Sequence, residues 1–179
     1  MASILKVNTI QDATNSNTAM TIDSSGRVTR PVRVGFKIGA STHNQTSDLT
    51  GNITQYNNLR TTVGDFNDGA YNTTTCVYTV PVAGVYIMGC HAFSYGENHI
   101  EVLIRQNDVA VGGNQQNGSN DESNYEVATL ATITNCAVGD TLAVYSNATK
   151  YHLNTQSSFF YGTISNSSEC CYLVVTFVI

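Results

Sequence analysis

Apolar residues in this chain recur at every second position or in short runs, and almost never at the spacing of an amphipathic helix. The runs are separated by clusters of Gly, Asn, Asp and Ser, which favour turns. These clusters are FNDG, VAG, GENH, RQND, AVGD and SNSS. Because a period of two places apolar side chains on one face of a strand, the pattern predicts an all-β protein.

Nine strands are predicted from runs rich in Val, Ile, Thr and aromatic residues. They cover residues 32–38, 53–63, 76–80, 85–93, 100–105, 125–133, 141–145, 159–164 and 172–179. The first 30 residues differ in character, because their two short β-like pieces, SILKVNTI and AMTIDSSGRV, are too small to bury a core. We therefore expect a head domain over residues 31–179 with an appendage over residues 1–30, which becomes ordered only against identical copies or a larger partner.

Charge excludes several classes of partner. Only 12% of the residues are charged and the formal net charge is -5, so the chain has no basic surface for a nucleic acid or an anionic membrane. No run approaches the roughly 18 apolar residues of a membrane helix, and the N-terminus lacks the order of a secretory signal. We expect a chain with no nucleic-acid or membrane partner that is not exported by the general route.

The five cysteines form an odd set without metal-ligand spacing. We expect them to be buried thiols that pack as small apolar side chains. They are Cys76, Cys90, Cys136, Cys170 and Cys171.

The segment DFNDGAYNTTTCVYTVPVAGVYIMGCHAF combines aromatic residues with a Pro-x-x-Gly, Gly-x-Tyr pattern. Two later segments, LATITNCAVGDTLAVYS and SSFFYGTIS, add a strand, a Gly-Asp turn and a Phe-x-Gly strand. Together these segments resemble the globular head shared by the complement first-component recognition protein and the tumour-necrosis-factor cytokines. The resemblance spans residues 32–165. It rests on Tyr71, Tyr78, Pro81, Gly84, Tyr86, Phe160 and Gly162.

This resemblance implies a jelly-roll sandwich of two antiparallel sheets that assembles as a homotrimer. It also implies that Tyr71, Tyr78, Gly84, Tyr86, Phe160 and Gly162 serve the core or the trimer contact. The chain departs from the family at Met88 and Cys90, where aromatics are usual, and in the spacing of Asn67. The closing strand is either residues 158–165 or residues 171–179.

Two further patterns bear on assembly. The runs VYIM and YLVVTFVI alternate poorly, so both faces of these strands favour burial, one in the sandwich and one against a neighbouring subunit. In the stretch YTVPVAGVYIMG, Gly84 follows Pro81 closely and permits a sharp reversal, which brings the flanking strands into one body.

The opening segment MASILKVNTIQDATNSNTAMTIDSSGRV resembles the start of structural proteins from marine tailed bacteriophages, cyanophages in particular. The resemblance implies that residues 1–30 attach the chain to other virion proteins. The leading hypothesis is a virion protein, either a short trimeric fibre that attaches to the host or a capsid decoration protein without receptor binding. A secreted lectin-like binding module and a glycan-degrading tail-spike enzyme are the alternatives.

A polar stretch over residues 111–124 carries no residue that would face a core, and it is predicted to be an exposed loop. Its amide and hydroxyl groups could exchange hydrogen bonds with a host-surface glycan. The candidate ligand residues are Asn114, Gln115, Gln116, Asn117 and Asn120.

Catalysis has little support in the sequence. The pairs Asp65 with Asp68 and Glu97 with Glu101 are better explained as turn or surface residues than as catalytic carboxylates. His91 and His99 could give a metal site on a trimer axis, and the oxygen-rich loops 65–68 and 120–122 could hold calcium, but neither follows a metal-ligand pattern. No nucleophile elbow or nucleotide-binding fingerprint occurs. We predict no catalytic, cofactor or metal site.

Overall fold

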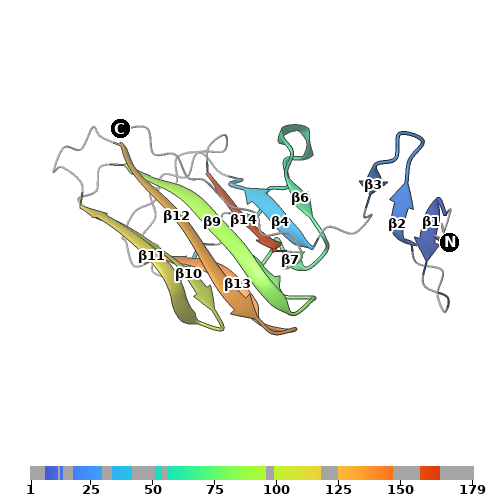
Figure 1. Ribbon diagram of the computed structural model, residues 1–179. Helices are drawn as coiled ribbons and strands as arrows, with labels where there is room; N and C mark the ends of the chain where they lie inside the picture. The colour runs from blue at the N-terminus through green and yellow to red at the C-terminus, as the bar shows by residue number, and fades with distance from the viewer. Residues whose placement is uncertain are drawn as a thin grey trace, which may run out of the picture. The chain divides into compact units, whose positions relative to one another are not determined.

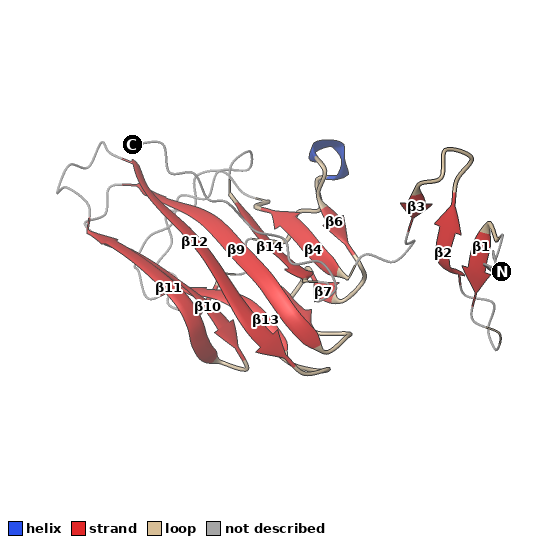
Figure 2. Cartoon of the chain, viewed as in Figure 1, coloured by secondary structure: helices blue, strands red, loops and turns tan. Residues whose placement is uncertain are grey.

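The computed structural model describes residues 7–11, 13, 18–29, 34–41, 51–53, 56–95, 99–117, 125–146 and 158–165. The chain divides into two compact units, Met1–Val34 and Gly35–Ile179. Strands make up nearly all the regular structure in these ranges, with one short 3-10 turn at Thr61–Val63, as Figure 2 shows.

The first unit contains a small antiparallel sheet of β1 (Thr9–Gln11), β2 (Thr18–Ile22) and β3 (Val28–Thr29). Ile10 pairs with Met20, and Ile22 pairs with Val28, so these four apolar residues share one face of the sheet. None of the residues in this unit whose exposure is described is buried, and Val28 is 59% exposed. The sheet therefore has an apolar face but no core.

The second unit is a sandwich of two antiparallel sheets. The five-stranded sheet has the order β12-β9-β14-β4-β6, and the six-stranded sheet has the order β11-β10-β13-β8-β7, with β5 also paired to β13 (Figure 1). The strands of the first sheet are β4 (Gly35–Gly39), β6 (Phe66–Asn67), β9 (Gly84–Tyr95), β12 (Tyr125–Cys136) and β14 (Phe159–Ile164). Those of the second are β5 (Gly51–Asn52), β7 (Tyr71–Asn72), β8 (Val77–Thr79), β10 (His99–Gln106), β11 (Val109–Asn117) and β13 (Thr141–Ser146).

The core lies between the two sheets, where alternate residues of each strand point inward. Aromatic rings dominate one part of it. The ring of Phe36 lies 4.8 Å from that of Tyr71, 4.5 Å from Tyr78 and 4.7 Å from Phe160, measured between centroids. Aliphatic side chains fill the rest. The fully buried members include Ile38, Met88, Ile100, Ile104 and Leu142.

The stretch between Tyr78 and Gly89 connects the two layers. β8 belongs to the six-stranded sheet and β9 to the five-stranded sheet, so the turn after Pro81 carries the chain from one to the other. The expectation that Gly84 supplies backbone freedom is wrong, since Gly84 is not among the glycines with positive φ. A Cβ at this position would instead lie 2.8 Å from Cδ1 of Ile164, so the residue is small because a side chain packs on it.

Two of the strand and loop predictions are also wrong. Residues 53–63 were expected to form a strand, but residues 61–63 form a 3-10 turn, and Asn58 makes only an isolated bridge to Gly39. Residues 111–117 were expected to be a loop, yet they belong to β11 and pair with β10. Of the two candidate closing strands, residues 159–164 form β14, which pairs with β9 and β4, whereas residues 171–179 lie outside the described residues.

Cys76, Cys90 and Cys136 are buried thiols, as expected, whereas Cys170 and Cys171 lie outside the described ranges. Burial raises the pKa of Cys90 to about 12, so this thiol is protonated at neutral pH and acts as an apolar core group.

Gly162 offers a test of the packing between the layers. A Cβ at this position would lie 2.9 Å from Cε1 of Phe36, inside the aromatic cluster. Gly162→Ala should therefore lower the free energy of unfolding by about 1–3 kcal/mol through overpacking. Thr163→Ala, at the exposed neighbouring position, should change it by less than about 0.5 kcal/mol. Equal denaturation midpoints for the two variants would contradict this account of the core.

Candidate binding and assembly surfaces

The six residues predicted to serve the core or the trimer lie mainly inside one chain. Tyr71, Tyr78, Tyr86 and Phe160 are buried between the sheets, and Gly162 is buried beneath Phe36. Gly84 is half-buried at the start of β9. The hydroxyl of Tyr86 donates a hydrogen bond to the carbonyl of Val82, at 2.9 Å, within the same chain. A subunit contact must therefore use other side chains.

Other apolar side chains lie on the outer side of the five-stranded sheet. Tyr86 and Met88 point inward, so Val85 and Ile87 point outward, as the poor alternation of VYIM indicated. Val85 is 40% exposed and Ile133, which pairs with Ile87, is 65% exposed. We name this surface the apolar face and define it by Val85, Ile87, Ile133, Phe159 and Tyr161.

The apolar face is also flat at its centre. Tyr161 pairs with Gly89, and its ring extends across this glycine, where any Cβ would collide with the phenol. Phe159 is packed from two sides: the ring of His91 stacks on it at 5.7 Å, and Nζ of Lys37 lies 5.7 Å from its centroid. The result is an aromatic surface with one cationic group at its margin.

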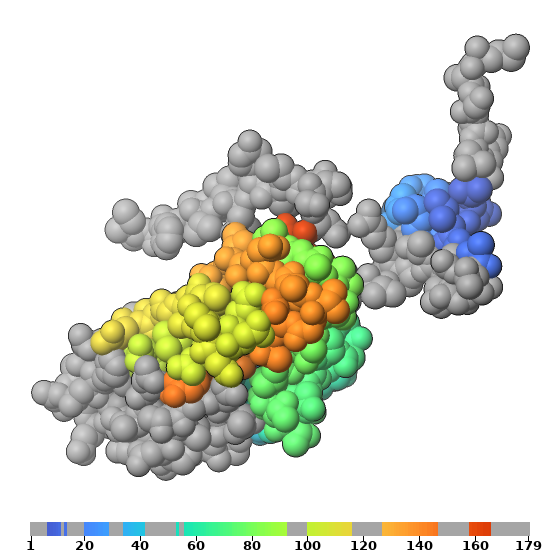
Figure 3. Space-filling model, turned by 90° about the horizontal axis from the view of Figure 1, so that it is seen from below, coloured from blue at the N-terminus to red at the C-terminus, as the bar shows by residue number. Residues whose placement is uncertain are grey.

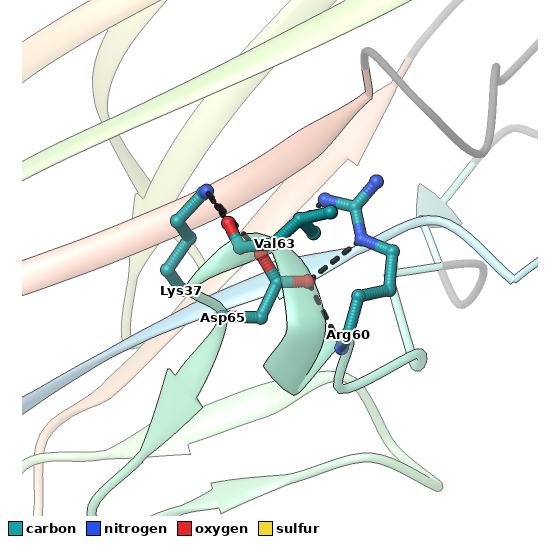
Figure 4. A network of polar contacts seen from close by, with 4 residues as sticks. All are labelled: Lys37, Arg60, Val63 and Asp65. Atoms are coloured by element: carbon teal, nitrogen blue, oxygen red, sulfur yellow. Dashed lines mark hydrogen bonds and ion pairs between the residues drawn. The ribbon is translucent and has the colours of Figure 1, made fainter.

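A buried carboxylate anchors that margin, as Figure 4 shows. Oδ2 of Asp65 accepts hydrogen bonds from Nε of Arg60 at 2.7 Å and from the backbone N–H of Arg60 at 3.1 Å. Nζ of Lys37 lies 3.3 Å from Oδ1. Burial acts to raise the pKa of Asp65, but the hydrogen bonds and charge of Arg60, aided by Lys37, outweigh it and hold the pKa below its usual value.

The neighbouring Asp68 and Asn67 make structural hydrogen bonds. Oδ2 of Asp68 accepts from the backbone N–H of Gly35 and from the hydroxyl of Tyr78, both at 2.8 Å, so it links β4 in one sheet to β8 in the other. The side chain of Asn67 accepts from the N–H of Gly69 and donates to the carbonyl of Tyr71. These contacts explain the segment GDFNDG without a metal or a catalytic pair.

A metal centre has no support in the part of the chain that the structure covers, where no three His, Cys, Asp or Glu residues are placed to hold an ion. His91 stacks on Phe159, and the side chains of Glu97, His99 and residues 120–122 lie outside what is described. Within the same ranges, no helix is long and apolar enough to cross a membrane.

The predicted ligand residues lie on the edge strand β11. Nδ2 of Asn114 donates to the carbonyl of Thr129 in β12, at 2.7 Å, and Oγ1 of Thr132 in β12 donates to the carbonyl of Val111, at 3.0 Å. Asn114 therefore joins the edges of the two sheets, which lie side by side in Figure 3. Gln115 is exposed; Gln116 and Asn117 belong to β11 without described side chains, and Asn120 lies outside the described residues.

Several surface residues were missed from the sequence. Lys37, Arg60 and Tyr161 define the apolar face and its margin, and Arg105 packs against Tyr145 on the outside of the six-stranded sheet. The sequence could have indicated the three that lie on strands. Side chains alternate between the two faces of a strand, so Lys37, Arg105 and Tyr161 point outward because their neighbours in the sequence point into the core. The role of Arg60 depends on the fold, since its partners come together only through the turn at Thr61–Val63.

Comparison with known proteins supports the fold. No protein-family model and no curated protein matches the chain. Among solved structures, Eiger TNF from S. frugiperda is similar with a TM-score of 0.60 and 17% identity, over 76% of this chain and 95% of that one. The globular domain of the zebrafish complement 1qA protein is similar with a TM-score of 0.50 and 15% identity, over 75% of this chain and 98% of that one. The head domain is thus a jelly roll of the type found in the TNF and complement globular domains.

The Asp65 network gives a prediction with a defined pH dependence. The pKa of Asp65 is lower in the folded protein than the value of about 3.9 in an unfolded chain. Its contribution to stability is therefore present above about pH 4 and is lost as the pH falls through the folded pKa. Asp65→Asn should lower the free energy of unfolding at pH 7 by about 1–3 kcal/mol, and the difference from wild type should shrink below about pH 4.

Denaturant unfolding measured between neutral and acid pH checks this. Asp23→Asn is the control, because Asp23 forms an ion pair with Arg27 in the exposed turn of the first unit, and it should leave the unfolding of the head unchanged. A difference between Asp65→Asn and wild type that stays constant through acid pH would contradict the assigned role.

Proposed function

We propose that this protein is a trimeric virion protein of a tailed bacteriophage, either a short fibre or a surface decoration. In this proposal residues 1–30 bind other virion proteins, and the jelly-roll head binds a host-surface glycan. The observation that carries the assembly part is the apolar face, on which Val85 and Ile133 are exposed and the other three residues are half-buried. The virion assignment rests on the resemblance of residues 1–30 to the openings of phage structural proteins.

A second subunit is the natural cover for the apolar face. Aromatic and aliphatic side chains gathered on one surface are typical of the core of a permanent interface. In a cyclic trimer each subunit presents two different patches, so that every face meets the patch of its neighbour and the ring closes. The family that the sequence resembles assembles in threes, which supports this number over two.

The N-terminal sheet needs a partner for a different reason. Its apolar residues Ile10, Met20, Ile22 and Val28 share one face, but a sheet of three short strands without a core is marginal in water. The unit Met1–Val34 also carries four basic and two acidic residues in a chain whose net charge is -5. An apolar face on a basic unit favours attachment to a larger, acidic protein surface.

The oligomeric state tests the assembly part. Light scattering of the purified protein should give a mass near three times 19.3 kDa. Ile133→Asp should dissociate the trimer without unfolding the head, because the carboxylate would be desolvated in the interface but lies on the surface of a single chain. Val109→Asp is the matched control, since Val109 is 66% exposed at the start of β11, in the six-stranded sheet and not on the apolar face. A wild-type protein that is monomeric at micromolar concentration would refute the trimer.

Deletion of residues 1–30 tests the attachment part. The truncated protein should remain a folded trimer, because the sandwich has its own core, but it should no longer join the particle when expressed during infection. Normal incorporation of the truncated chain would refute the role given to residues 1–30.

An adsorption assay then separates a fibre from a decoration protein. Purified trimer in excess should slow attachment of phage to host cells if the head binds the host, and many copies on one particle would amplify a weak single-site affinity. A trimer that joins particles but does not compete would be a decoration protein without receptor binding.

A further inference from the structure

Arg105 lies on the outside of the six-stranded sheet, in β10, the strand next to the edge strand β11. Ile104 beside it in β10 is fully buried, so Arg105 points to the opposite side. It pairs with Ala143 of β13 on one side and with Ala110 of β11 on the other. Both directly paired neighbours are small, so neither of these two side chains covers the guanidinium.

The charge of Arg105 lacks the compensation that the other described basic side chains have. Arg27 forms an ion pair with Asp23, and Lys37 and Arg60 both contact Asp65. Among the residues that the structure describes, no hydrogen bond or ion pair joins Arg105 to a partner, and its Nε is buried without an acceptor. Donors of a guanidinium that are removed from water without an acceptor are costly, so this arrangement favours an external anion.

Two features hold the guanidinium in one place. Its Cζ lies over the ring of Tyr145, 3.3 Å from the centroid, which restricts the side chain by a cation–π contact. A β-bulge lies beside it, because Ile104 pairs with Gly112 whereas Arg105 pairs with Ala110, leaving Val111 as the extra residue. Bulges change the direction in which nearby side chains point and are frequent beside binding sites.

The surroundings select among anions. The unit Gly35–Ile179 carries four basic and eleven acidic residues, a net charge of -7 with histidines neutral, so a polyanion would be repelled. A ligand with a single carboxylate on an otherwise uncharged molecule is repelled less than a polyanion. Its two oxygens also match the planar fork of the arginine guanidinium. Farther along the same outward side, Thr141 of β13 pairs with Thr79 of β8. The hydroxyl of Thr141 donates to Oδ1 of Asn107 but keeps its lone pairs as acceptors.

We propose that Arg105 and Tyr145 form a binding site for a carboxylate-bearing sugar, in which the guanidinium donates hydrogen bonds to the carboxylate and the threonine pair lies toward the sugar hydroxyls. The inference names a ligand class for the glycan-binding role proposed above and rests on it. It also replaces the predicted ligand residue Asn114, whose side-chain amide donates to the carbonyl of Thr129 in the other sheet. Arg105 and Tyr145 take its place as the ligand-binding residues.

The test is a titration of the full-length protein, observed by NMR, with methyl glucuronide and with methyl glucoside, which lacks only the carboxylate. The glucuronide should bind in the millimolar range. Its affinity should be roughly 10-fold higher than that of the glucoside, because only the acid makes a charge-assisted pair with arginine. Equal binding of the two sugars, or no binding of the glucuronide, would overturn the proposal.

Variants assign the effect to the site. Arg105→Gln should abolish the preference for the acid, and Arg105→Lys should weaken it several-fold, because lysine keeps the charge but loses the planar fork. Tyr145→Leu should also weaken it by releasing the guanidinium. Arg27→Gln changes the net charge equally on an exposed residue of the other unit and should bind as wild type does. If Arg105→Lys bound the glucuronide as tightly as wild type does, a positive charge alone would be enough for binding, and the proposed site would be overturned.

A third probe separates sugar from peptide. N-acetylglutamate amide carries the same carboxylate on a peptide body, and it should bind more weakly than the glucuronide; equal affinity would overturn the sugar assignment. The assay is also independent of the adsorption test. A trimer that slows adsorption without binding glucuronide contradicts this site alone, whereas glucuronide binding without competition contradicts the host-attachment role and leaves the site standing.

Discussion

The packing of Phe36 against three other rings is the contact on which the sandwich depends. Phe36 comes from β4 and Phe160 from β14 in one sheet, while Tyr71 and Tyr78 come from β7 and β8 in the other. Aromatic pairs at these separations add about 0.5–1.5 kcal/mol each beyond the area that they bury. Because the cluster draws on strands far apart in the chain, it defines how the two layers face each other.

Polar side chains then close the edges of the layers. Asp68 connects the N–H of Gly35 to the hydroxyl of Tyr78 on one side, and Asn114 and Thr132 connect β11 to β12 on the other. Such contacts satisfy buried or edge groups that would otherwise be exposed to pairing with other chains. Part of the Asn and Asp content of the chain is therefore explained by structural contacts rather than by a binding site.

With the core and the edges occupied, the outer surfaces of the two sheets remain available, and they differ in chemistry. The five-stranded sheet carries the apolar face with the Lys37, Arg60 and Asp65 network at its margin, which suits assembly. The six-stranded sheet carries Arg105 on Tyr145 among small neighbours, which suits a ligand. In the two proposals made above, self-association and recognition therefore use opposite layers of the sandwich.

The sequence alone determined the all-β class and most of the strands, because period-two alternation and turn residues are local signals. The two antiparallel layers were implied by the resemblance to the globular heads and not by the periodicity. The sequence also indicated residues 158–165 as one of two candidate closing strands, and it named four of the buried aromatic residues, Tyr71, Tyr78, Tyr86 and Phe160. It could not show that residues 53–63 leave the sheet, nor that the polar residues 111–117 form a strand, because pairing partners supplied by β10 decide the latter. Three features were decided only by the tertiary structure. Ile164 packs on Gly84, Arg60 and Lys37 form ion pairs with Asp65, and the guanidinium of Arg105 stacks on the ring of Tyr145. Each depends on atoms brought together from distant parts of the chain, and local pattern carries no information about which distant residues will meet.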